Sequence, residues 1–115
     1  HPYYATLISY YTDVVRPIDE NNIYYLGKEV FCIRAEGYMM WDRLAEQMAD
    51  LLVKSPAAIL KWHGSFTIGD SLSDAFNNTQ ALEIASRLII DTQRFKSALG
   101  EPELPDYAPG PTIQN

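Results

Sequence analysis

The chain has 115 residues, of which 47% are hydrophobic and 21% charged, and its formal net charge is −6. This length and composition indicate one globular domain and exclude a chain that is disordered throughout. The nine basic residues are scattered along an acidic chain, which excludes nucleic acid as a partner because neutralising phosphates requires clustered lysine and arginine.

The first predicted element is a tyrosine-rich helix over residues 3–15, because apolar side chains recur there at helical spacing and Pro17 prevents its continuation. Its aromatic side chains are expected in the core or at an interface between subunits; they are Tyr3, Tyr4, Tyr10 and Tyr11. A polar turn over residues 19–22 follows. Segments 23–26 and 29–33 then resemble two strands on either side of Gly27.

The second half of the chain alternates helices with apolar segments. A helix is predicted from Trp41 until Ser55 and Pro56 end it. Residues 57–62 predict a strand buried on both faces, and residues 65–68 predict a second strand. Asp70 or Ser71 is expected to cap a helix that Gly100 ends. Residues 1–100 are therefore assigned to the domain and residues 101–115, with their four prolines, to an extended tail.

Cys32 is the only cysteine, and it lies in the apolar run 30–33. It is expected to pack as a small hydrophobic side chain rather than to act as a nucleophile. A chain without an internal disulfide is compatible with a reducing compartment, and no apolar run approaches the ~20 residues of a membrane span. We therefore expect a cytoplasmic protein that does not use a membrane as a partner.

His63 is the most informative residue, because an apolar strand brings it to the strand's end and Gly64 then lets the backbone turn. It is either a hydrogen-bonded structural histidine or part of a metal or substrate site, since sites are often built at such loop edges. The only other histidine is His1. A copper site formed by the amino group and ring of His1 with His63 is an alternative, although proteins with such sites are secreted β-sandwiches.

Three segments of the chain resemble the class II aldolase/adducin family. They are His1-Pro2-Tyr3-Tyr4-Ala5-Thr6, then Arg16-Pro17-Ile18-Asp19 through Tyr25-Leu26-Gly27-Lys28, and finally Trp62-His63-Gly64 with Gly69, Ala75 and Leu82-Glu83. The resemblance implies a three-layer α/β/α fold with a mixed or antiparallel sheet that is incomplete on its N-terminal side. It also implies a homotetramer.

In functional terms, the resemblance implies that His1 and His63 are two of three histidine ligands to zinc or another divalent metal. The implied activity is metal-dependent aldol cleavage, or a related epimerisation or dehydration, of a small phosphorylated sugar or hydroxyketone. The alternative is a catalytically inactive domain of the adducin type, used for assembly. A sequence that includes the family's upstream glutamate and His-x-His pair would favour the enzyme.

Three features expected of the family lie before His1, namely its first histidine, its acid/base residue and its phosphate-binding loops. We therefore expect these residues to be the C-terminal part of a longer polypeptide and to be inactive alone. Tyr107 is a candidate proton donor, because family members bring a late tyrosine to the site. Glu83 is expected to have a structural or intersubunit role, and Asp70 and Asp74 to be charges at the start of a helix.

Overall fold

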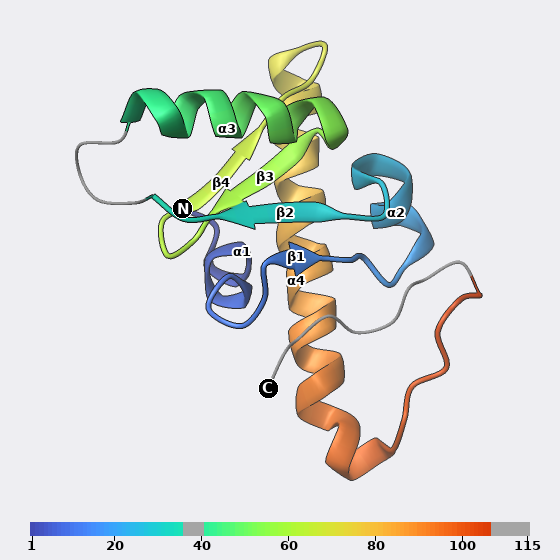
Figure 1. The fold of residues 1–115 in the computed structure, drawn as a ribbon. Helices are drawn as coiled ribbons and strands as arrows, with labels where there is room; N and C mark the ends of the chain where they lie inside the picture. The colour runs from blue at the N-terminus through green and yellow to red at the C-terminus, as the bar shows by residue number, and fades with distance from the viewer. Residues whose placement is uncertain (36–40, 107–115) are drawn as a thin grey trace.

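A computed structural model describes residues 1–35 and 41–106 of the chain. Four helices and four strands are present in these ranges (Figure 1). In chain order they are α1 (Tyr3–Ile8), β1 (Val14–Val15), α2 (Glu20–Leu26), β2 (Val30–Ile33), α3 (Trp41–Lys54), β3 (Ala57–Leu60), β4 (Gly64–Thr67) and α4 (Leu72–Leu99). No helix in the described part of the chain is long and apolar enough to cross a membrane.

The four strands form one mixed sheet in the order β1-β2-β3-β4. β1 pairs antiparallel with β2, placing Val14 opposite Phe31, and β2 pairs parallel with β3, placing Cys32 opposite Ile59. β3 and β4 form an antiparallel hairpin. The hairpin turn, which carries His63, therefore lies at one end of the sheet.

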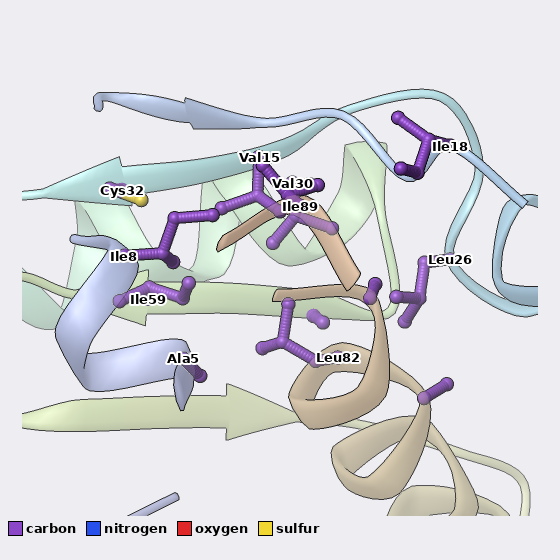
Figure 2. Close-up of a cluster of buried hydrophobic side chains, with 13 residues drawn as sticks. Ala5, Ile8, Val15, Ile18, Leu26, Val30, Cys32, Ile59, Leu82 and Ile89 are labelled. Carbon is purple, nitrogen blue, oxygen red and sulfur yellow. The ribbon is translucent and has the colours of Figure 1, made fainter. Parts of the chain in front are cut away.

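Helices cover both faces of this sheet, which gives the predicted three-layer α/β/α arrangement (Figure 1). α3 packs on one face, and α1, α2 and α4 pack on the other. All four residues of β3 are buried. Ala57 and Ile59 belong to the larger core, in which Figure 2 shows Ile59, whereas Ala58 and Leu60 contact the apolar side of α3. The predicted strand buried on both faces is confirmed over Ala57–Leu60, whereas Lys61 and Trp62, which were predicted to continue it, belong to the turn.

The larger core gathers side chains from five elements around α4 (Figure 2). Ile8 of α1, Val15 of β1, Val30 of β2 and Leu82 of α4 are each fully buried. Burying such a side chain contributes about 1.5–3 kcal/mol relative to leaving it in water. This core therefore fixes α1, and with it the start of the chain, against the sheet and α4.

The predicted limits of α4 are confirmed. Ser71 is the N-cap, and its Oγ accepts a hydrogen bond from the backbone N–H of Asp74 at 3.1 Å. Gly100 ends the helix in the left-handed region with a φ of 83°. Gly69 makes the entry possible, since a Cβ there would lie 2.5 Å from the backbone N of Ala75.

The predicted helix over residues 3–15 is wrong in its second half, because α1 ends at Ile8 and Val14–Val15 form β1. The hydroxyl of Thr12 accepts from the backbone N–H of Val14 and donates to its carbonyl oxygen, which forms a tight turn. Two consecutive β-branched valines favour an extended backbone. Pairing with β2, which the helical spacing did not reveal, decides the outcome.

The predicted turn over 19–22 and strand over 23–26 are also wrong, because these residues form α2. Asp19 caps the helix by accepting the backbone N–H of Asn22 at 3.2 Å, and Gly27 ends it with a φ of 80°. An aspartate at the N-cap and a glycine just after the last residue are both typical signals of a helix, and Asp19 and Gly27 provide them here. The Ile-Tyr-Tyr run has high β propensity, which favoured the wrong prediction of a strand.

Candidate metal centre

The turn between β3 and β4 carries His63 and has an unusual backbone. Trp62 adopts a φ of 69°, a left-handed conformation that bulky residues rarely take. Its backbone N–H donates to Ser9 Oγ at 3.1 Å, and the N–H of His63 donates to the carbonyl oxygen of Leu60 at 3.0 Å. Contacts to both α1 and β3 therefore determine how His63 leaves the strand.

His1 lies directly against this turn. Its Nδ1 is 2.6 Å from the backbone carbonyl oxygen of His63, a residue 62 positions away in the chain. A carbonyl oxygen only accepts hydrogen bonds, so Nδ1 must carry the proton. In the neutral ring the lone pair then lies on Nε2. Gly64 permits the approach, since a Cβ there would lie 3.3 Å from Nδ1 of His1.

This geometry suits a metal ligand. Ligating histidines almost always donate their second ring N–H to a carbonyl or carboxylate, which fixes the ring and directs the other nitrogen to the metal. The side chains of His1 and His63 are both exposed. Imidazole nitrogens are preferred ligands of Zn²⁺. The ring of His1 therefore has the orientation of a metal ligand, and it lies at the turn that carries His63.

A complete ligand set is not formed by the described residues, among which no three His, Cys, Asp or Glu side chains form a metal-binding group. Structural zinc sites use four protein ligands and catalytic sites use three. The three-layer fold also differs from the β-sandwich on which the copper alternative was based.

Glu83 has a structural contact within the chain. Its Oε1 accepts the backbone N–H of Ala5 at 2.8 Å, which satisfies a free donor in the first turn of α1. Arg87, one helical turn further along α4, places its guanidinium carbon 5.5 Å from the ring centre of Tyr4. These contacts hold α1, and therefore His1, against α4.

Cys32 packs as predicted. It lies on β2 and is only 7% exposed, within the larger core. Burial raises the pKa of its thiol to about 12, with the nearby Lys61 opposing that effect. The thiol is therefore protonated at neutral pH and is not activated as a nucleophile.

Asp70 and Asp74 lie far from the histidines along the hairpin. They line a groove of about 650 Å³ together with Pro56 and Ile68. Pro56 precedes β3 and Ile68 follows β4, so the groove lies at the end of the hairpin opposite the turn that carries His63. The groove therefore does not include the histidine pair. Tyr107, the candidate proton donor, lies outside the described residues.

The tyrosines of the predicted first helix were expected in the core or at an interface, and a place in the core is wrong for three of them, whereas Tyr4 is half-buried. Tyr3, Tyr10 and Tyr11 are each more than half exposed, at 67%, 60% and 51%. Helical spacing placed Tyr11 on an apolar face, but the helix ends before it.

Ser9 is a neighbour of the site that no sequence pattern predicted. Ser9 is fully buried and lies 53 positions from Trp62, to which it is hydrogen-bonded. A single serine after a helix carries no local signal for such a contact. The left-handed backbone of Trp62 was equally hidden, since glycine and asparagine are the residues that normally indicate it.

A family model and several solved structures match the chain. The family model for the class II aldolase and adducin N-terminal domain matches residues 1–90. The fold is similar to that of L-fuculose-1-phosphate aldolase from Thermus thermophilus, with a TM-score of 0.77 and 23% identity over 84% of this chain and 52% of that one.

Two further structures are similar at somewhat higher identity. Both are YgbL, described as a candidate aldolase, epimerase or decarboxylase. The Escherichia coli protein has a TM-score of 0.65 and 26% identity over 76% of this chain and 44% of its own. The Klebsiella pneumoniae protein has a TM-score of 0.63 and 30% identity over 88% and 47%. The chain thus spans about half the length of these structures. No match was found among curated proteins.

Proposed function

Because the chain belongs to the class II aldolase and adducin family, we propose that it contributes two ligands of a divalent metal site to an aldolase-type lyase, with zinc as the metal. The observation that carries the proposal is the hydrogen bond between Nδ1 of His1 and the carbonyl oxygen of His63. This contact joins His1 to the turn that carries His63, and it leaves the lone pair of His1 Nε2 free to coordinate a metal.

In this proposal the chain's own residues hold and orient the site. His1 and His63 provide imidazole nitrogens, and the hydrogen bond between them limits rotation of the His1 ring. Glu83 supports α1 from α4, because it accepts the N–H of Ala5. When bound, a divalent cation supplies Lewis-acid polarisation of a carbonyl oxygen, which favours cleavage of the adjacent carbon–carbon bond.

The proposed substrate is a small phosphorylated sugar or a related hydroxyketone. The similarity to L-fuculose-1-phosphate aldolase supports this class, and the candidate activities of YgbL support epimerisation as a related reaction. The third ligand, the acid/base group and the phosphate contacts are then supplied by residues outside those described. We also propose a homotetramer in the cytoplasm, with the exposed tyrosines of the first segment as part of its contact surface.

Elemental analysis of the purified full-length protein tests the metal assignment. We expect bound zinc, and we expect His63→Ala and His1→Ala each to lower zinc content at least several-fold, because each removes one of few nitrogen donors. Circular dichroism should remain native, since both side chains are exposed.

Asp74→Ala is the matched control for this experiment. It removes a carboxylate from the groove at the other end of the hairpin and should leave zinc content unchanged. If zinc stays bound in both histidine variants, the metal site is elsewhere and His63 is structural. If the native chain binds no divalent metal, the proposal fails and the adducin-type assembly role becomes the better interpretation.

A further inference from the structure

We propose that Ser9 and Trp62 are positioning residues for the His1–His63 site, in that they hold the hairpin turn in the one conformation that directs the carbonyl of His63 toward the ring of His1. This inference extends the proposed function. It rests on contacts around the turn, none of which involves a metal.

The backbone of Trp62 is the first observation. A φ of 69° brings Cβ close to the following carbonyl, which disfavours this region for residues other than glycine, asparagine and aspartate. Such a conformation persists only where surrounding contacts determine it, and it occurs preferentially at functional sites. Trp62 directly precedes His63, so its φ and ψ orient the peptide unit from which His63 and its carbonyl extend.

A hydrogen bond to Ser9 stabilises the strained backbone of Trp62. The Oγ of Ser9 accepts the backbone N–H of Trp62 at 3.1 Å while its hydroxyl donates to the carbonyl oxygen of Thr6 at 2.6 Å. Ser9 is fully buried, where a hydrogen bond cannot be replaced by water. The turn is therefore tied to the C-terminal end of α1, the helix at whose start His1 lies.

The side chain of Trp62 is held as well. The rings of Tyr10 and Trp62 pack edge to face with their centres 6.5 Å apart, and Arg34 places its guanidinium carbon 5.4 Å from the centre of the Trp62 ring. Tyr10 follows Ser9 in the chain, and Arg34 follows β2. Contacts from α1 and from the sheet thus converge on Trp62 while 46% of its surface remains exposed.

These contacts have one consequence at the site. The carbonyl of His63 lies 2.6 Å from Nδ1 of His1, and it selects the ring form with the proton on Nδ1 and the lone pair on Nε2. Without the bond to Ser9, the backbone of Trp62 would relax toward negative φ and the carbonyl of His63 would turn away. The ring of His1 would then lose its fixed proton position.

The test measures the ring of His1 directly, in the metal-free full-length protein, by ¹⁵N NMR at alkaline pH. We expect the native ring to carry its proton on Nδ1 and Ser9→Ala to mix the two tautomers. In titrations with zinc alone, Ser9→Ala should raise the Kd by roughly 10-fold, the usual effect of losing a residue that orients a ligand. Ser97→Ala, at the exposed end of α4, should change neither value.

A second variant separates positioning from general packing. Trp62→Asn introduces a residue that tolerates positive φ but removes the ring contacts with Tyr10 and Arg34. The double variant Ser9→Ala/Trp62→Asn should therefore recover part of the native tautomer population and part of the zinc affinity. An unchanged tautomer in Ser9→Ala, or no recovery in the double variant, would overturn the inference. If Ser9→Ala shows the tautomer change but the native protein binds no zinc, the proposed metal site is refuted and the positioning role stands.

Discussion

At the level of single residues, Lys61 shows how a charge is accommodated beside the candidate site. It is 6% exposed, two residues before His63, and its ammonium group forms an ion pair with Asp13. The hydrogen bond from Lys61 holds the pKa of Asp13 below its ordinary value of 3.8, and attraction to Lys61 and Arg34 adds to that effect while partial burial opposes it. Asp13 precedes β1, so the pair joins the sheet's outer strand to the end of β3.

This ion pair predicts an acid-sensitive contribution to stability. Because the pKa of Asp13 is lowered in the folded state, its contribution is present above the unfolded-state pKa and is lost as pH falls through the folded value. Asp13→Asn should lower the free energy of unfolding at neutral pH by about 1 kcal/mol, since the carboxylate is largely exposed and screened.

Urea unfolding at several pH values measures this effect. The difference between native and Asp13→Asn protein should shrink as the pH is lowered through the unfolded-state and then the folded-state pKa of Asp13. Asp50→Asn, at an exposed position on α3, should show no comparable difference at neutral pH. An equal loss for Asp13→Asn at all pH values would show that the ion pair is not the cause.

At the level of elements, α1 is short and depends on its neighbours. It has six residues and no acidic side chain in its own first turn, and helices of this length are unstable alone. Ala5 and Ile8 bury its inner side in the larger core, and Glu83 of α4 accepts the Ala5 N–H at 2.8 Å. Tertiary contacts therefore replace local helix signals.

Glu83→Ala should loosen α1 and lower the free energy of unfolding by about 1–2 kcal/mol, because it leaves a backbone donor in the first turn without its charged acceptor. Glu83→Gln keeps an acceptor oxygen at the same place and should lose clearly less. Amide hydrogen exchange should become faster in α1 for Glu83→Ala and remain native in α3. Unchanged exchange in α1 would mean that the core alone holds the helix.

At the level of the entire fold, one face of α1 and the residues after it present unburied aromatic rings. Tyr3, Tyr10 and Tyr11 are exposed in the monomer, and aromatic side chains are enriched where subunits meet. This surface adjoins the His1–His63 site through Tyr10 and its contact with Trp62. A contact between copies of the chain here would place the site near a subunit boundary.

Light scattering tests the proposed assembly. The full chain at micromolar concentration should have the mass of an oligomer, with a tetramer as the proposed form. Tyr11→Glu should shift the distribution toward smaller species, because it places a charge within the contact surface. Tyr24→Glu, at an 83% exposed position on α2, should not. A monomeric native chain would contradict the proposed assembly.

Local sequence patterns determined much of the fold. The apolar stripe of α3, the cap by Ser71, the end of α4 at Gly100 and the fully apolar β3 each depend on neighbours within a few residues. Such local signals do not depend on distant parts of the chain. They were therefore sufficient to predict α3, α4 and the β3–β4 hairpin, and to place His63 at the end of a strand.

Contacts between distant segments decided the rest. Val14 and Val15 form a strand because β2 is beside them, and the ring of His1 reaches the carbonyl of His63 because Glu83 and the core place α1 there. The left-handed backbone of Trp62 depends on Ser9, 53 positions away. A pattern in the sequence reports only short-range preferences, whereas these features arise from hydrogen bonds and burial that exist only once the chain has folded.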